Sequence, residues 1–340
     1  MRHIQKIEFN HLYGSDILQL YFKKIKSINQ NAFFGFENLK CLELNQNKID
    51  TIHPGSFKTL DKLEELKFEK LNPILFSTLC ADTFSGLQNL SSLQISDADF
   101  SDGPMSINLK RNIFSNLKSL HFLHLSNNNI KEIEPGFFNG NNCLKTLFLS
   151  GNQIKNLDCR SFQGLDSLEA LYLNYNRLES LEMTVFSHLT QLKELHIESN
   201  EITDLVKEEN FSELESLVEL NLATNSIKKI DPGYFGMFPN LEKLNLFSNQ
   251  IENIDEATFS CLNMLTSLEL NLNNIKEIKQ NTFLGMINLK TINLSSNKIT
   301  TIDKNLFKEL RNIEEIDLSD NKLDKIMLVK IGLDEQKIII

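Results

Sequence analysis

The segment LHFLHLSNNNIKEIEPGFFNGNNC (residues 120–143) is followed directly by LKTLFLSGNQIKNLDCRSFQGLDS (residues 144–167). Both begin with Leu and have Leu again at positions four and six, Asn at nine, Ile at eleven and Phe at nineteen. The same frame recurs from residues 168, 192, 217, 241, 265, 289 and 313, and upstream from residues 39, 63 and 90. A period near 24 residues, held over most of the chain, predicts a solenoid in which each repeat stacks on its neighbours.

The repeats define the predicted domain organisation. We expect a single solenoid over residues 1–340 with about 13 repeats. Residues 39–331 hold the clear repeats, residues 15–38 a degenerate N-terminal repeat, and residues 63–119 irregular long repeats. We expect the tail at residues 332–340 to leave the last repeat uncapped.

Each recurring position has a structural use. Leu-x-Leu alternates with period two, so both Leu side chains face one side of a short strand. Stacked strands of this kind bury their apolar side in a continuous Leu core under a parallel sheet. The Asn at position nine follows the strand, and its amide can both donate to and accept from backbone groups of neighbouring turns. The Phe series from Phe57 to Phe307 is expected to form a second spine on the opposite side.

This pattern resembles the leucine-rich repeat family in its typical 24-residue subtype, which occurs in Toll-like receptor ectodomains, Slit, chaoptin-like adhesion proteins and small matrix proteoglycans. The resemblance implies an α/β solenoid, shaped as a horseshoe with a concave parallel β-sheet and a convex side of loops and short helical turns. Extracellular members normally have Cys-rich caps, whereas here no Cys precedes Cys41 or follows Cys261. We therefore expect a fragment or an incomplete gene model; an intracellular protein, or a tail that folds over the last repeat, remains open.

Composition excludes several classes of protein. The chain of 340 residues has 41% apolar and 24% charged residues, a net charge of −10 and a sequence pI near 5.3, so nucleic acid is not an expected partner. No apolar run reaches the roughly 18 residues of a membrane helix, and no signal peptide is visible at the N-terminus. The five widely spaced Cys residues form no zinc motif, so no metal or cofactor is expected, although a disulfide or two remains open.

The outward positions that flank each Leu-x-Leu are free to encode a ligand. Read in order, the fifth positions contain four consecutive rings: His124, Phe148, Tyr172 and His196. In a parallel sheet such rings would lie about 4.8 Å apart. Phe122 and Tyr175 flank this run, so we expect these six residues to bind a ligand. The alternative is an aromatic ladder that only supports the sheet.

Charge on the same face points to a protein partner. Lys145 and Glu169 are the only charged residues at the outward positions around the rings. Acidic residues surround this centre: Glu64, Glu65 and Glu69 on one side, and Glu194, Glu198 and Glu219 on the other. An uncharged aromatic centre with a charged rim is typical of protein interfaces, and the acidic flanks favour a ligand with basic patches. A homodimer is compatible with this interpretation, and the histidines leave pH-sensitive binding open.

Three N-glycosylation sequons begin at Asn89, Asn210 and Asn293. Their number does not exceed chance in a chain this rich in Asn, so they do not argue for secretion. If the chain is secreted, a glycan on Asn293 would lie on the concave wall and keep the ligand away from that end.

Two repeats are long, because Phe57 and Phe84 are 27 residues apart and Phe84 and Phe114 are 30 apart. The extra residues lie within 72–83 and 97–112, where Leu71 and Ala98 also replace the Asn of position nine. We expect them to bulge from the loop or convex side, either as a recognition loop or as a tolerated insertion.

No catalytic motif is present, so we do not expect an enzyme. The favoured function is that of a protein-binding receptor ectodomain at the cell surface, similar to the Toll-like type and acting in innate immunity. A secreted or membrane-attached adhesion or matrix scaffold is the second hypothesis. The third is a cytoplasmic, inhibitor-type repeat protein.

Overall fold

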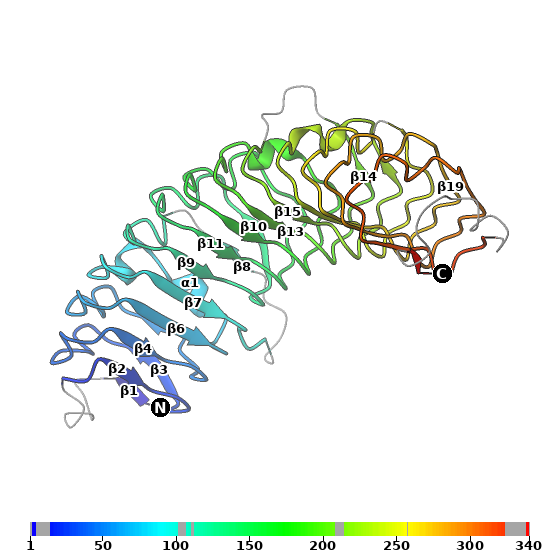
Figure 1. Cartoon of the computed structure of the whole chain (residues 1–340). Coiled ribbons are helices and arrows are strands. Elements are labelled where there is room, and N and C mark those ends of the chain that lie inside the picture. The colour runs from blue at the N-terminus through cyan, green and yellow to red at the C-terminus, as the bar shows by residue number, and fades with distance from the viewer. Residues whose placement is uncertain are drawn as a thin grey trace. The chain divides into compact units, whose positions relative to one another are not determined.

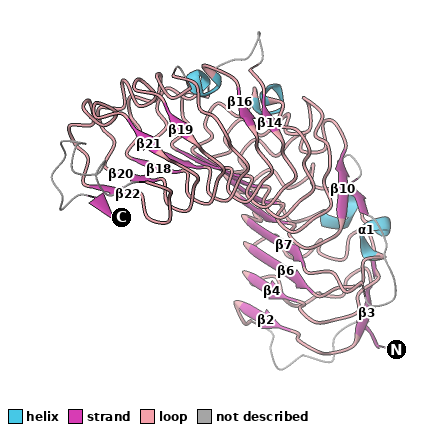
Figure 2. Ribbon diagram, turned by 90° about the vertical axis from the view of Figure 1, so that its right-hand side faces the viewer, coloured by secondary structure: helices cyan, strands magenta, loops and turns pink. Residues whose placement is uncertain are grey.

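The computed structural model describes residues 2–4, 14–100, 107–109, 112–207, 214–256, 258–323 and 338–339. The chain divides into two compact units, Met1–Tyr172 (unit 1) and Leu173–Ile340 (unit 2). Each unit is a stack of repeats, and each repeat contributes one short strand to a parallel sheet. Figure 2 shows that loops and turns make up most of every repeat and that helices are confined to short segments.

The sheet of unit 1 contains β2, β4, β6, β7, β9, β11 and β12 in that order, and every neighbouring pair is parallel (Figure 1). Their bounds are Ile17–Gln19, Cys41–Glu43, Glu65–Glu69, Ser92–Ser96, Phe122–His124, Thr146–Phe148 and Ala170–Tyr172. Shorter pairings join β1 (Arg2–Ile4), β3 (Ile25–Ile28) and β5 (Thr51–Ile52), and join β8 (Ile107–Leu109) to β10 (Ile130–Ile133). The helical segments are α1 (Leu75–Thr78) and the 3-10 helix η2 (Ala81–Phe84).

The sheet of unit 2 contains β13, β15, β17, β18, β20, β22 and β23. Their bounds are Glu194–His196, Glu219–Asn221, Lys243–Asn245, Ser267–Glu269, Thr291–Asn293, Glu315–Asp317 and Ile338–Ile339. Two short pairs accompany it, β14 (Asp204–Leu205) with β16 (Lys229–Ile230) and β19 (Glu277–Ile278) with β21 (Thr301–Ile302). The 3-10 helices are η3 (Met183–Phe186) and η4 (Tyr234–Met237).

The Leu positions form the core of each unit. Leu123, Leu147 and Leu171 of unit 1 are fully buried, as is Leu195 of unit 2. Burying one such side chain contributes about 1.5–3 kcal/mol. Since these residues occupy the middle of their strands, the residues on either side of them point to the opposite, outer face of the sheet.

The Asn ladder is confirmed and links successive turns. Asn152 donates from Nδ2 to the carbonyl oxygens of Leu125 (3.0 Å) and Leu149 (2.8 Å). Its Oδ1 accepts from the backbone N–H groups of Asn128 (3.1 Å) and Ile130 (3.0 Å) in the preceding repeat. Asn249 of unit 2 has the same pattern, donating to Leu222 and Leu246 and accepting from Ile227. One amide therefore satisfies backbone groups that the turn would otherwise leave buried and unpaired.

The sheet is altered where the ladder Asn is missing. β6 and β7, which end just before Leu71 and Ala98, are five residues long and pair in register from Glu65↔Ser92 to Glu69↔Ser96. The first long segment, residues 72–83, folds into α1 and η2, and Leu75 and Phe76 are buried. It therefore packs against the unit through Leu75, Phe76 and Leu79, whereas Ile74 is exposed. Within the second long segment, residues 101–106 and 110–111 lie outside the described residues, and β8 pairs with β10.

The Phe spine is present in both units. In unit 1, the ring centroids of Phe57 and Phe84 are 6.4 Å apart with an interplanar angle of 5°. In unit 2, Phe283 stacks on Phe259 at 6.4 Å and on Phe307 at 6.0 Å. These rings are almost completely buried. The Phe positions are therefore structural, as the sequence predicts.

The predicted solenoid of leucine-rich repeats with a parallel sheet is confirmed. The side away from the sheet includes short paired strands as well as the expected loops and helical turns. One continuous solenoid over residues 1–340 stays a prediction. All five Cys residues are free thiols, so the disulfides left open by the sequence are not formed. Among the described residues, no helix has the length and apolar character needed to span a bilayer.

Candidate functional site

Four aromatic residues share the outer face of the sheet in unit 1. Phe122 and His124 are the two ends of β9, Phe148 ends β11, and Tyr172 ends β12. The parallel register places His124 opposite Phe148 and Phe148 opposite Tyr172. We call Phe122, His124, Phe148 and Tyr172 the aromatic cluster. It arises because the fully buried Leu at the centre of each strand turns the flanking residues outward.

The rings of the aromatic cluster are in mutual contact. Phe148 stacks on Tyr172 with a centroid distance of 4.3 Å and an interplanar angle of 6°. Its centroid lies 5.3 Å from Phe122 and 5.1 Å from His124, and both of those rings are tilted relative to it. Phe122 and His124 meet edge to face at 6.3 Å. Phe148 is therefore the centre of the cluster, within the range of distances at which aromatic pairs attract one another.

The aromatic cluster is half-buried, and the strand residues beside it are uncharged. Thr146 and Ala170 fill the remaining outward positions of β11 and β12. Lys145 and Glu169, which directly precede β11 and β12, form an ion pair of 2.9 Å with each other. Burial lowers the pKa of His124, although the carboxylates of Asp97 and Glu69 oppose this shift. The His124 ring is therefore neutral at pH 7 and acts as a polar aromatic surface.

Tyr175 and His196, the other two predicted site residues, belong to unit 2. Tyr175 is 63% exposed and has a left-handed backbone conformation with φ of 55°. His196 lies between Glu194 and Glu198, with each nearest nitrogen–oxygen distance 3.9 Å. Burial raises the pKa of Glu198. An uninterrupted row of rings from His124 to His196 stays a prediction.

The glycosylation sites differ in accessibility. Asn89 is exposed, and its Nδ2 donates to the carbonyl oxygen of Asp61 at 2.8 Å. Asn293 is half-buried at the end of β20, where its Oδ1 accepts from the backbone N–H of Ser295 at 3.0 Å. Asn210 lies outside the described residues. Modification of all three stays a prediction.

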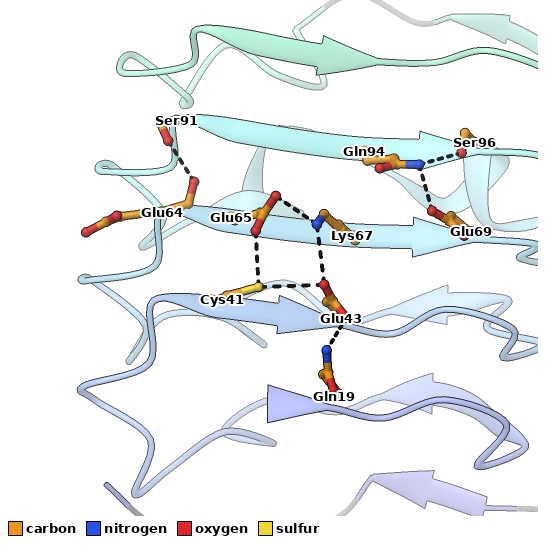
Figure 3. Close-up of polar contacts among 10 residues, drawn as sticks. All are labelled: Gln19, Cys41, Glu43, Glu64, Glu65, Lys67, Glu69, Ser91, Gln94 and Ser96. Carbon is orange, nitrogen blue, oxygen red and sulfur yellow. Dashed lines mark hydrogen bonds and ion pairs between the residues drawn. The ribbon is translucent and has the colours of Figure 1, made fainter. Parts of the chain in front are cut away.

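A polar network on β2, β4 and β6 was not found from the sequence (Figure 3). Lys67 Nζ lies 2.9 Å from Glu65 Oε1 and 3.3 Å from Glu43 Oε1. Gln19 Nε2 donates to Glu43 at 2.9 Å, and Cys41 Sγ donates to Glu65 Oε2 at 3.3 Å. Gln19 and Glu43, Cys41 and Glu65, and Glu43 and Lys67 are each 24 residues apart, at equivalent outward positions of neighbouring strands. This spacing is the feature of the sequence that could have predicted the network.

The same network brings Cys41, Glu43 and Glu65 within 4.8 Å of one another, close enough to ligate a metal ion. The ammonium of Lys67 already lies between the two carboxylates. Burial, more than the hydrogen bond to Glu65, raises the pKa of Cys41 to about 11, which keeps the thiol protonated. A metal ligand would need the thiolate. The arrangement is therefore an ion-pair network in which one ammonium group bridges two carboxylates and leaves one negative charge.

Comparison with known proteins places these features in context. The solved structures similar to this chain include the TLR13–ssRNA13 complex, with a TM-score of 0.73 and 25% identity over 95% of this chain and 50% of that one. An internalin from Listeria monocytogenes is similar over 89% of this chain and 87% of its own, with a TM-score of 0.60 and 25% identity. The Drosophila Toll–Spätzle complex, at 19% identity and a TM-score of 0.66, shares the fold.

Curated relatives include chicken (Gallus gallus) epiphycan, 30% identical over 136 residues, and bovine (Bos taurus) mimecan, 30% identical over 143 residues. These matches cover 34% and 36% of this chain, and 40% and 45% of the relatives. The chain thus spans less than half the length of these relatives and half that of TLR13.

A family model described as "Leucine rich repeat" matches residues 16–74, 116–178, 167–227, 215–275 and 264–323. Together these segments cover more than half of the chain, and they include the strands that present the aromatic cluster. Proteins with this repeat and fold are typically non-enzymatic protein-interaction modules, and the relatives include Toll-like receptors and proteoglycans. The chain therefore belongs to the leucine rich repeat family.

Proposed function

We propose that this chain is the ligand-binding region of an extracellular receptor and that it captures a protein ligand on the aromatic cluster of unit 1. The stacking of Phe148 on Tyr172, with Phe122 and His124 against Phe148, is the observation that carries this proposal. Half-buried rings lose little conformational freedom on binding and can be desolvated at low cost, so they are typical anchors of protein interfaces.

The surroundings of the cluster support a protein ligand more than a nucleic acid. TLR13 was solved with ssRNA13, so RNA is the competing class of ligand. RNA binding depends on Lys and Arg side chains that neutralise phosphates. Lys145 directly precedes β11, one of the strands that carry the aromatic cluster, and its ammonium group is already paired with Glu169. The net charge of −10 also opposes a polyanion.

The decisive experiment removes the cluster without changing charge. Peptides selected from a random display library on the wild-type chain would be measured against the double variant Phe148→Ala, Tyr172→Ala. Because two anchoring rings are removed, most of the selected peptides should bind the double variant at least about 30-fold more weakly, which corresponds to about 2 kcal/mol of binding free energy. Phe22→Ala is the matched control, because Phe22 is an aromatic residue of the same unit and is 70% exposed.

The circular dichroism spectrum must stay unchanged in both variants. Equal binding by the wild type and the double variant would remove the aromatic cluster as the site. A loss of the same size in Phe22→Ala would show non-specific apolar adsorption.

A matrix or adhesion scaffold is the second candidate function, because epiphycan and mimecan are among the relatives. This function predicts self-association of the chain. Sedimentation velocity over a range of micromolar concentrations separates the two proposals: a receptor region without its ligand stays monomeric, whereas a scaffold forms dimers or larger species. A receptor that dimerises only with ligand would form dimers only after ligand is added.

A further inference from the structure

Two carboxylates lie beside the aromatic cluster. Glu69 ends β6 and Asp97 directly follows β7, the strand that pairs with β9 of the cluster. Gln94 is in register with His124 on β9, and its Nε2 donates to Glu69 Oε1 at 2.9 Å (Figure 3). Both carboxylates act electrostatically on the His124 ring. An acidic margin therefore adjoins the ring surface within unit 1.

Neutral donors hold these carboxylates in place. Asp97 Oδ1 accepts from Asn127 Nδ2 at 2.8 Å, and its Oδ2 accepts from Ser96 Oγ at 2.8 Å. Glu69 accepts from Gln94. Within the part of the chain that the structure describes, neither carboxylate forms an ion pair with Lys or Arg. Both side chains are half-buried, and these hydrogen bonds fix the positions of their carboxylates.

Three other outward carboxylates of unit 1 have cation partners. Glu43 and Glu65 share Lys67, and Glu169 pairs with Lys145. The neutral His124 ring does not supply a compensating charge at pH 7, because burial lowers its pKa. Among the described residues of unit 1, these two oriented carboxylates at the margin of the aromatic surface therefore have no Lys or Arg partner.

A planar cation fits this combination. A guanidinium group can stack on an aromatic face and donate two parallel hydrogen bonds to a carboxylate at the same time. An ammonium group can form the ion pair but does not stack in this way. Cation–π attraction is strengthened where the ring is partly desolvated, as in this cluster.

We propose that His124 and Phe148, together with Asp97 and Glu69, form a recognition site for an arginine side chain of the protein ligand. This inference rests on the proposed function and narrows the ligand to proteins that present an exposed Arg at their binding surface. The guanidinium stacks on the ring surface and its N–H groups donate to Asp97 and Glu69.

The test uses a fluorescein-labelled peptide of four Gly-Arg pairs, with matched Gly-Lys and Gly-citrulline peptides, in fluorescence anisotropy at pH 7.5 and 150 mM NaCl. The wild-type chain should bind the Arg peptide several-fold more tightly than the Lys peptide, and the neutral citrulline peptide at least about tenfold more weakly. The double variant Glu69→Gln, Asp97→Asn should lose at least about tenfold in affinity for the Arg peptide, as expected when a charge-assisted hydrogen bond is lost.

The matched control is Glu314→Gln, Glu315→Gln, which removes two exposed carboxylates of unit 2 and changes net charge equally. It should change the affinity less than twofold. An equal loss in the control, or equal affinity for the Arg and Lys peptides, would show general charge attraction and overturn the inference. No binding of the Arg peptide by the wild type up to 1 mM, or tighter binding of an eight-residue oligouridylate, would overturn it as well.

The Phe148→Ala, Tyr172→Ala variant separates this inference from the proposed function. If the Glu69→Gln, Asp97→Asn variant binds the Arg peptide as the wild type does while the ring variant loses the library-selected binders, the inference fails and the proposed function stands. If the ring variant retains those binders, the proposed function fails and the inference fails with it.

Discussion

Replacing one ladder asparagine by alanine tests how the repeats are held together. Asn152 is 2% exposed, and its side chain makes five hydrogen bonds with backbone groups, the longest of them from Nδ2 to the carbonyl oxygen of Ser150 at 3.4 Å. The change Asn152→Ala leaves the N–H groups of Asn128 and Ile130 and the carbonyl groups of Leu125 and Leu149 without this partner. We expect a loss of about 3–5 kcal/mol in the free energy of unfolding, because each net bond contributes about 1 kcal/mol and buried unpaired groups cost more.

Urea unfolding followed by circular dichroism measures this loss, provided that the slope of the transition is unchanged between variants. Amide hydrogen exchange adds a local measurement, because the N–H groups of Asn128 and Ile130 should lose protection. Asn156→Ala is the matched control, since Asn156 is an exposed residue of the same repeat, and it should change stability by less than about 0.5 kcal/mol. A loss below about 1 kcal/mol for Asn152→Ala, or one equal to the control, would refute the reasoning from buried hydrogen bonds.

The remaining predictions concern the Phe spine, a half-buried carboxylate and a half-buried thiol. Phe283→Ala should destabilise unit 2 by about 3–5 kcal/mol because the ring is 1% exposed between two stacked neighbours, whereas Phe22→Ala should have little effect in thermal unfolding. Burial raises the pKa of Glu198 in the folded protein above its value in the unfolded chain. The contribution of this shift to the free energy of unfolding is fully present at pH below the unfolded-state pKa, and it is lost as pH rises through the folded-state pKa. Glu198→Gln should therefore stabilise the protein at pH 7 and flatten the dependence of its stability on pH above 4; a less stable variant at pH 7 would contradict this. Cys41, with its pKa raised to about 11, should react with iodoacetamide at pH 8 more slowly than the exposed Cys159, as read by mass spectrometry, and the difference should vanish in urea.

Much of the fold could be predicted from the sequence because it repeats. The 24-residue period, the Leu-x-Leu strands, the Asn of position nine and the Phe spine are each visible in the order of residues, and each is present in the structure. The positions of Phe122, His124, Phe148 and Tyr172 on one outer face follow from the same period. These features depend on the backbone geometry that the regular 24-residue repeats share.

Only the tertiary structure decided how side chains interact on the outer face. The sequence placed His124, Phe148 and Tyr172 at equal intervals, yet Phe148 stacks flat on Tyr172 and meets His124 at a tilt. It likewise did not show that Lys67 lies between Glu43 and Glu65.

The 24-residue spacing of these positions does not by itself determine the contacts. Side chains on an open face adopt rotamers that depend on the size, charge and hydrogen-bonding capacity of their neighbours. In the core, by contrast, close packing leaves each Leu and Phe a single place, and the repeat itself specifies that place. The repeat period therefore determines the scaffold, while the competition among neighbouring side chains determines the surface available for recognition.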